Sequence, residues 1–272
     1  GGLEGIKQIK ALDDSLSNKQ ALTDLAAELQ AIHQLVLTGP SQYLIVGEEE
    51  RLEEYTDILR GKVVVPDAAT TNLFSYNRPS SRATQVWKTS TQVNFCAHAY
   101  ATVASGHPDA AALTVLGGFL RNGFLHTAIR ERGGAYGGGA SQDNQIGAFR
   151  FYSYRDPRIV DTLKDFEASL DWLQNETHEW RQVEEAILGV VSAIDKPASP
   201  AGEAKQTFHA ELYGNSREIR EQFRARVLEV TLGDLQRVAS QYLTPERRHS
   251  AVITSPSRAD ELAGAGFEVL SL

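Results

Sequence analysis

The first predicted element is a helix, because the apolar positions of residues 22–36 follow the i, i+3, i+4, i+7 spacing of an amphipathic helix. Gly39 and Pro40 end this helix, since the pair interrupts a helical pattern. Polar residues dominate the rest of the stretch. We therefore expect residues 1–38 to be a linker helix or the tail of a preceding domain, and residues 39–272 to form the main domain.

Alternating patterns and β-branched or aromatic residues predict several strands downstream. The predicted strand regions are residues 43–46, residues 86–103 as one strand or two, and residues 250–254 before an exposed tail. Residues 135–154 predict a hairpin, because side chains alternate along the second arm and Asp143-Asn144 stand at the turn. Residues 61–81 contain two prolines and many Ser, Thr and Asn residues, which indicate a loop.

Helical patterns account for most of the remaining chain. The predicted helices cover residues 108–132, with a break at Asn122-Gly123, and residues 157–194, and further helices begin at Ser199, Ser216 and Thr231. Asp156-Pro157 predicts a helix start, because Asp is a good N-cap and Pro suits the first helical position. The order of the elements predicts an α+β fold, with a single mixed or antiparallel sheet and helices packed on one face.

Composition and charge argue against several classes of protein. Hydrophobic residues make up 42% and charged residues 23% of the 272 residues, as in ordinary globular domains. The net charge of −8 and the lack of a long basic run argue against nucleic-acid binding. No apolar run approaches the roughly 20 residues that a membrane span needs. The single cysteine, Cys96, lies in an apolar stretch, where we expect a buried, unreactive thiol.

The most informative segment is residues 124–140, which read FLHTAIRERGGAYGGGA. The pattern predicts that a helix ends at Arg132, that two glycines reverse the chain, and that a strand begins at Ala135. Arg130 in the last helical turn and Tyr136 at the start of the strand can then point into one crevice. An Arg offers a fork of donors for a carbonyl or carboxylate, and a Tyr offers a phenolic donor for a developing oxyanion.

Each of these residues also has a purely structural interpretation. An Arg near a helix C-terminus interacts favourably with the helix dipole, and a Tyr in a strand usually packs. The glycines at 137–139 do not form a phosphate-binding loop, because neither Gly-x-x-x-x-Gly-Lys-Ser/Thr nor Gly-x-Gly-x-x-Gly is present.

Residues 124–140 resemble the signature LHxxIREKGGAYGGGA of the C-terminal halves of presequence proteases, which are pitrilysin- or insulinase-type zinc peptidases. Residues 151–157, FYSYRDP, are similar to the LYSYRDP segment of that branch, and the spacing to residues 198–200 also fits. The resemblance runs from about residue 40 to the C-terminus. It implies a domain like the metallohydrolase domains of the mitochondrial processing peptidase.

The resemblance also implies an activity: a zinc metalloendopeptidase that encloses short unstructured peptides between two halves. The C-terminal half supplies an Arg and a Tyr, here Arg130 and Tyr136, that hold the substrate backbone and the tetrahedral intermediate at the zinc. Gly137 and Gly138 leave backbone free for a peptide to approach. The zinc ligands belong to the N-terminal half of the same polypeptide or to a separate zinc-bearing subunit. This chain alone is therefore expected to bind no metal and to be inactive.

Histidine spacing is part of this expectation. The family's metal motif is His-x-x-Glu-His, and no two histidines here have that spacing. The seven histidines are His33, His98, His107, His126, His178, His209 and His249. His126 belongs to the signature but has no histidine partner, so we expect it to be structural. Neither Gly-x-Ser-x-Gly nor a cofactor fingerprint is present.

Two functional hypotheses follow from the resemblance, and a third is unrelated to it. The first is the substrate-binding part of a zinc metalloendopeptidase, located in the cytoplasm or in an organelle matrix. The second is a non-catalytic subunit or scaffold that pairs with a separate zinc-bearing chain, although the presence of both Arg130 and Tyr136 argues against a purely structural role. The third is an unrelated α+β binding module.

Overall fold

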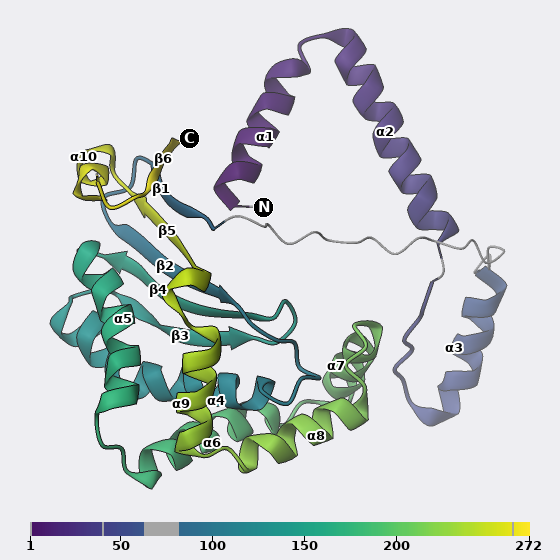
Figure 1. The fold of residues 1–272 in the computed structure, drawn as a ribbon. Coiled ribbons are helices and arrows are strands. Elements are labelled where there is room, and N and C mark those ends of the chain that lie inside the picture. The colour runs from purple at the N-terminus through teal and green to yellow at the C-terminus, as the bar shows by residue number, and fades with distance from the viewer. Residues whose placement is uncertain (1, 40, 63–81, 263) are drawn as a thin grey trace. The chain divides into compact units, whose positions relative to one another are not determined.

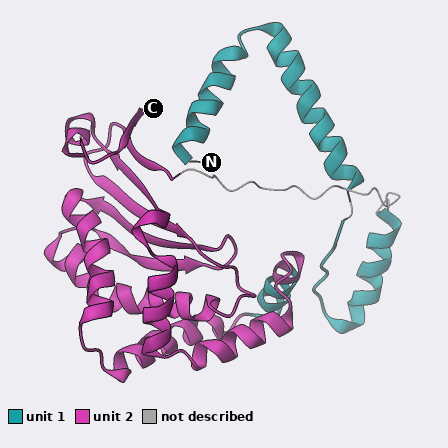
Figure 2. Cartoon of the chain, viewed as in Figure 1, with its two compact units in different colours: residues 1–78, 199–208, 272 teal, residues 79–198, 209–271 magenta. Residues whose placement is uncertain are grey.

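The computed structural model describes residues 2–39, 41–62, 82–262 and 264–272, and the chain divides into two compact units (Figure 1, Figure 2). The first unit comprises residues 1–78, 199–208 and 272, and the second comprises residues 79–198 and 209–271. The predicted division into a linker over residues 1–38 and a domain over residues 39–272 stays a prediction.

The first unit contains the helices that precede the sheet in sequence. They are α1 (Gly2–Ser15), α2 (Lys19–Thr38) and α3 (Glu49–Lys62), and α7 (Pro200–Leu212) begins in this unit. Asn18 caps α2, since its side chain accepts a hydrogen bond from the backbone N–H of Gln20 at 2.8 Å. The predicted amphipathic helix over residues 22–36 is confirmed within α2.

The predicted strand at residues 43–46 is wrong, because these residues have no regular structure. Their side chains are exposed or half-buried, and no strand among the described residues pairs with them. A short apolar run forms a strand only where a neighbour satisfies its backbone N–H and C=O groups. The predicted loop at residues 61–81 lies outside the described residues from 63 onward.

A six-stranded mixed sheet forms one layer of the second unit (Figure 1). The strands are β1 (Thr84–Lys88), β2 (Asn94–Ala101), β3 (Gly137–Asp143), β4 (Ala148–Asp156), β5 (Arg248–Thr254) and β6 (Glu268–Ser271). Their order is β3-β4-β2-β5-β1-β6, with β1 parallel to β5 and β6 and the other neighbours antiparallel. The hairpin predicted over residues 135–154 is confirmed as β3 and β4, and β3 lies at one edge of the sheet.

Helices cover one face of this sheet, so the predicted α+β fold is confirmed (Figure 1). They include α4 (Ala110–Leu120), the π-helix η1 (Arg121–Arg132), α5 (Val160–Asn175), α6 (Trp180–Ile194), α8 (Arg217–Leu228) and α9 (Leu232–Tyr242). α4 is apolar all round and almost entirely buried, because it contacts β3 as well as α6, α8 and α9. None of the described helices is long and apolar enough to cross a membrane.

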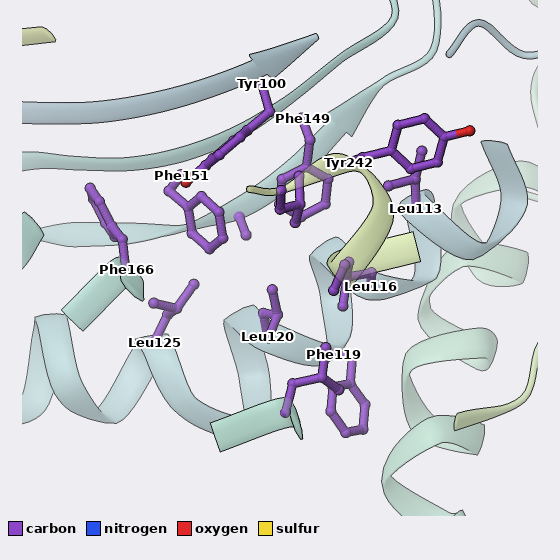
Figure 3. Close-up of a cluster of buried hydrophobic side chains, with 14 of the residues drawn as sticks. Tyr100, Leu113, Leu116, Phe119, Leu120, Leu125, Phe149, Phe151, Phe166 and Tyr242 are labelled. Carbon is purple, nitrogen blue, oxygen red and sulfur yellow. The ribbon is translucent and has the colours of Figure 1, made fainter. Parts of the chain in front are cut away.

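A cluster of buried side chains joins the sheet to these helices (Figure 3). Its largest members include Tyr100, Leu116, Leu120, Leu125, Phe149, Phe151 and Phe166. Phe151 makes edge-to-face contacts with Tyr100 and Phe149, at centroid distances of 6.0 and 5.3 Å. Full burial contributes about 1.5–3 kcal/mol per large apolar side chain, so this cluster fixes α4 against the sheet. Cys96 lies in the cluster, so the predicted burial of this cysteine is confirmed, and burial raises the pKa of its thiol to about 12.

The helix that begins at Ala110 does not break at Asn122-Gly123, contrary to the prediction. α4 passes directly into η1, which continues to Arg132. A Cβ atom at Gly123 would lie 2.5 Å from the ring of Trp172. This glycine therefore lets an indole pack closely against the helix, and it does not end the helix.

The connection between β4 and α5 also differs from the prediction. α5 begins at Val160, and Asp156 is the last residue of β4, where it is fully buried. Its carboxylate accepts hydrogen bonds from the backbone N–H of Arg158 at 2.9 Å and from the Thr162 hydroxyl at 2.8 Å. Asp156 therefore ties the strand to the helix from outside the N-cap position.

The segment after residue 254, predicted as an exposed tail, is largely exposed, but it also extends the sheet. The chain continues through α10 (Pro256–Ala259) and η3 (Asp260–Leu262) into β6, which adds to the sheet beside β1. The register pairs Val86 with Val269. This parallel pairing joins segments far apart in sequence, which a local pattern cannot reveal.

Candidate functional site

The chain reverses direction where η1 ends and β3 begins, and we call residues 129–137 the η1–β3 corner. Gly134 adopts φ of +77°, a left-handed conformation that glycine tolerates best. Its N–H donates to the carbonyl of Arg130 at 3.1 Å, and the N–H of Ala135 donates to the carbonyl of Ile129 at 3.1 Å. These bonds satisfy carbonyls of the last helical turn, so the predicted helix end at Arg132 and the glycine reversal are confirmed.

The side chain of Arg158 connects the end of η1, next to this corner, to α5. Its guanidinium donates to the carbonyl of Ala128 at 3.2 Å and to the carboxylate of Asp165 at 3.0 Å. A Cβ atom at Gly133 would lie 1.9 Å from the Arg158 guanidinium and 2.4 Å from the carbonyl oxygen of Ile129. The first glycine of the corner therefore makes room for a cation that fixes the end of η1 to α5.

Arg130 and Tyr136, the predicted catalytic pair, stand on either side of the reversal and both are exposed. Tyr136 lies one residue before β3 with 64% of its surface exposed, and its N–H donates to the carbonyl of Arg155 at 3.3 Å. No hydrogen bond or ring contact joins the side chains of Arg130 and Tyr136 to each other. Both side chains are thus free to meet a ligand, whereas their backbones are fixed.

The end of β4 brings two more side chains to the same place. The ring of Tyr154 lies 5.7 Å from the ring of Tyr136, centroid to centroid. The guanidinium carbon of Arg155 lies 5.5 Å from the Tyr136 ring centroid, which is a cation–π distance. The structure therefore surrounds Tyr136 with an aromatic ring and a cation that the sequence analysis did not single out.

A break in the strand pattern could have revealed these two residues. Alternation along β4 places Phe151 and Ser153 on the buried face, so a regular strand would bury Arg155 as well. A strand that buries an unpaired Arg is disfavoured. This conflict, directly before Asp156-Pro157, is the sequence signal that the strand contains an irregularity at this point.

Gly137 and Gly138, the predicted substrate-binding glycines, pack against atoms of this chain. A Cβ atom at Gly137 would lie 2.4 Å from the Tyr154 hydroxyl oxygen. A Cβ atom at Gly138 would lie 2.9 Å from Ile129 and 2.9 Å from the carbonyl of Tyr152. Both positions thus require glycine for the fold itself, and contact between these glycines and a substrate stays a prediction.

The described residues contain no group of three or more His, Cys, Asp or Glu side chains that could hold a metal ion. His98 is buried in β2, where burial and the nearby cation of Arg248 lower its pKa to about 3. His126 lies in η1 with its Nδ1 atom 3.3 Å from the carboxylate of Glu131. The described part of the chain therefore offers no ligand set for zinc, and no catalytic step is assigned to a metal here.

Comparison with known proteins identifies the class to which this fold and corner belong. The family model described as the PreP C-terminal domain matches residues 85–255, which include β2 to β5, α4 and the whole η1–β3 corner but not β6. The chain therefore belongs to the family of PreP C-terminal domains. The resemblance read from residues 124–140 is confirmed.

Several relatives are named mitochondrial presequence proteases. The Yarrowia lipolytica protein is 31% identical over 261 residues, which cover 93% of this chain and 26% of the relative. The Saccharomyces cerevisiae protein is 30% identical over 285 residues, covering 100% of this chain and 28% of the relative. The Xenopus tropicalis protein is 40% identical over 152 residues, 56% of this chain. The chain thus spans about a quarter of the length of the first two relatives.

Solved structures of related peptidases share the fold. A protease from Helicobacter pylori superimposes with a TM-score of 0.64 at 17% identity, covering 78% of this chain and 53% of that protein. The inactive domain of an M16 peptidase from Pseudomonas fluorescens superimposes with a TM-score of 0.58 at 16% identity, covering 77% and 51%. At such identities the comparison supports the fold alone.

Proposed function

We propose that this chain is the substrate-binding C-terminal part of a zinc metalloendopeptidase that degrades short unstructured peptides. The zinc and its ligands belong to an N-terminal half of the same polypeptide or to a separate zinc-bearing subunit. The observation that carries the proposal is the η1–β3 corner, which lies inside the family match and displays Arg130 and Tyr136 to solvent. The mitochondrial names of the relatives favour an organelle matrix over the cytoplasm.

The two exposed side chains suit different parts of the reaction. The phenolic O–H of Tyr136 donates to the oxyanion that develops when water attacks the scissile carbonyl. The guanidinium of Arg130 donates to a backbone carbonyl of the bound peptide. Zinc, when bound by the other half, supplies a Lewis acid and an activated water. Tyr136 and Arg130 orient the peptide and stabilise charge at that centre.

Gly137 and Gly138 contribute backbone groups to the proposed substrate site. They begin β3, which pairs with β4 along one side only. An edge strand presents unpaired N–H and C=O groups, which are a template for an extended peptide. The proposed peptide therefore lies along the edge of the sheet beside Tyr136.

Substitutions at the corner, introduced into the full protein with its zinc-bearing half, test this function. Tyr136→Phe is expected to lower kcat roughly 10²-fold with little change in KM, because the lost donor acts in the transition state. Arg130→Ala is expected to raise KM as well, and Arg130→Lys to rescue poorly because it lacks the fork. Steady-state hydrolysis of an unstructured peptide measures both constants.

A matched control separates the role of Tyr136 from a general loss of surface tyrosine. Tyr213 is 77% exposed, and Tyr213→Phe is expected to leave kcat and KM unchanged. Melting curves of all variants should coincide, since the substituted side chains are exposed. Full activity in both the Tyr136 and Arg130 variants would contradict the proposal and favour a scaffold that pairs with a separate zinc-bearing chain.

A further inference from the structure

Strand β4 contains a bulge directly beside the η1–β3 corner. The register with β2 pairs Asn94 with Asp156 and Cys96 with Ser153, so two residues of β4 stand opposite the single residue between Asn94 and Cys96. A bulge of this kind changes the direction of the following side chains. Tyr154 and Arg155 are consequently both exposed, although they are consecutive in a strand, whereas the residues on either side of the pair are buried.

Arg155 adopts a backbone conformation that an arginine rarely takes. Its φ is +48°, and it is the single non-glycine residue with positive φ among the described residues. Non-glycine residues in this region are strained, and such strain is often kept at ligand sites. Here the bulge places the Arg155 guanidinium 5.5 Å from the centre of the Tyr136 ring.

The guanidinium of Arg155 has no acidic partner among the described residues, unlike other arginines nearby. Arg150 lies five residues before Arg155 and is also exposed on β4. Its guanidinium lies 3.6 Å from the carboxylate of Asp143. Arg158 lies 3.0 Å from the carboxylate of Asp165. The contact between Arg155 and Tyr136 is with the face of the ring, so it leaves the N–H donors of the guanidinium unused.

The acidic residue next to Arg155 and the acidic residue of the η1–β3 corner have other partners. The buried carboxylate of Asp156 accepts hydrogen bonds from the N–H of Arg158 and from Thr162. The carboxylate of Glu131 lies 3.3 Å from His126 and accepts from Thr127 at 3.0 Å. A protein with a net charge of −8 therefore keeps an uncompensated cation beside Tyr136.

We propose that Arg155 is a second substrate-binding cation, which receives a carboxylate of the peptide bound at the η1–β3 corner. The planar fork of a guanidinium matches a carboxylate with two parallel hydrogen bonds. The carboxylate is either the C-terminus of the peptide or a Glu or Asp side chain, since both present the same group. This assignment rests on the proposed function, because it requires the peptide to lie beside Tyr136.

Equilibrium binding to the full protein, with zinc removed by a chelator, tests the assignment without hydrolysis. The probe is a fluorescently labelled unstructured peptide in matched forms, with a free or amidated C-terminus and with Glu or Gln near its end. Arg155→Gly is the main variant, because glycine accepts the backbone conformation and only the side chain is lost. Arg155→Lys keeps the charge but not the fork. Arg150→Ala is the matched control on the same strand face.

For a peptide carrying the recognised carboxylate, Arg155→Gly is expected to raise Kd about tenfold, as for the loss of a charge-assisted hydrogen bond. If Arg155→Gly no longer raises Kd once the peptide is amidated, Arg155 binds the C-terminal carboxylate. If it no longer raises Kd once Glu is replaced by Gln, Arg155 binds the carboxylate of that side chain. The Kd of Arg155→Lys should lie between those of the parent protein and Arg155→Gly. The Kd of Arg150→Ala should equal that of the parent protein.

An equal rise in Kd for every form of the peptide, or no rise at all, would overturn the carboxylate assignment. The proposed function is read separately, from the kcat of Tyr136→Phe in the zinc-loaded protein. If Tyr136→Phe lowers kcat while Arg155→Gly leaves Kd unchanged, the proposed function is supported, but the role of Arg155 in binding a carboxylate is contradicted. If Tyr136→Phe and Arg130→Ala are both fully active, the proposed function itself fails.

Discussion

The left-handed backbone of Arg155 predicts different stabilities for two substitutions that remove its side chain, Arg155→Gly and Arg155→Ala. A left-handed conformation costs an ordinary residue roughly 1–2 kcal/mol, but costs glycine little. Arg155→Gly and Arg155→Ala both lose the cation–π contact with Tyr136, so they differ mainly in backbone strain. We expect Arg155→Gly to be the more stable by about 1 kcal/mol, measured by urea unfolding. Equal stabilities would show that the φ of +48° is not maintained in solution.

A buried histidine makes stability depend on pH in the acidic range. Burial, with the cation of Arg248, lowers the pKa of His98 to about 3, and its ring meets Phe166 edge-on at 5.3 Å. The unfolded chain takes up this proton near pH 6.5, whereas the folded chain does so only near pH 3. The unfolded state therefore binds more protons between these values, and stability falls as the pH falls.

The expected loss from this one group is about 2 kcal/mol between pH 6.5 and pH 5. His98→Leu keeps a buried side chain of similar size and removes the titration. Urea unfolding across this pH range should therefore show a shallower fall in the free energy of unfolding for His98→Leu than for the parent. Parallel curves for the two proteins would mean that His98 is not neutral and buried in the folded state.

Among the elements, a glycine at the end of one helix and a glycine within another have opposite effects on stability. A Cβ at Gly133 would lie 2.4 Å from the carbonyl oxygen of Ile129 and 1.9 Å from the Arg158 guanidinium. Gly133→Ala is therefore expected to destabilise the protein by about 1–3 kcal/mol, because the end of η1 or Arg158 must move. Thermal unfolding would measure the loss, and kinetics would show whether displacement of the corner also lowers kcat.

Gly189 is the matched control in α6. It is exposed, and a Cβ there would meet nothing within 4 Å. Gly189→Ala should stabilise the helix by about 0.5–1 kcal/mol, since alanine loses less backbone entropy on folding. Destabilisation by both substitutions would show that packing at the corner is not the cause of the Gly133 effect.

Elements with strong local signals could be predicted from the sequence. The capping box at Thr231 and Asp234 begins α9, with the Thr231 hydroxyl accepting from the Asp234 N–H at 3.2 Å. The alternation of residues along β4 and the turn at Asp143-Asn144 predicted the hairpin. In each case the residues that signal the element are neighbours in sequence, so a local pattern is enough to predict it.

Elements that depend on distant partners could not be predicted. β6 forms because β1 is available to pair with it, whereas residues 43–46 have no pairing partner in the part of the chain that the structure describes. The sequence around Gly123 predicts a helix end, whereas this glycine makes space for Trp172, a residue of α5. At the site, Arg130 and Tyr136 were predictable from the motif, but Tyr154 and Arg155 joined them only through a bulge set by the pairing with β2.

At the scale of the whole molecule, the described side chains that could bind a metal are dispersed. No three His, Cys, Asp or Glu side chains gather among the described residues, and residues 63–81 add a single one by sequence, Asp67. A structural or catalytic zinc site needs three or four such ligands. The same fold presents the η1–β3 corner at the edge of a sheet, and under the proposed function the corner and the metal come from different parts of the complete protein.

The isolated chain is therefore expected to hydrolyse no unstructured peptide and to retain no stoichiometric zinc after equilibration and removal of free metal. A ligand at 100 times its Kd adds about 2.7 kcal/mol to the stability of a folded protein. A specific zinc site would thus raise Tm by several degrees, whereas we expect equal Tm values with zinc, with magnesium and without added metal. Metal analysis and melting curves on the same sample make the comparison.

The decisive step is to join this chain to its zinc-bearing half. Hydrolysis should then appear, and Tyr136→Phe in this chain should remove most of it although the substituted residue binds no metal. Stoichiometric zinc that resists a chelator in the isolated chain would instead show that this chain has its own zinc site. It would contradict the proposal that the zinc ligands belong to another half or subunit. Activity that appears on joining but is unaffected by substitution of both Tyr136 and Arg130 would leave this chain as a scaffold, because its exposed corner would then contribute nothing to the reaction.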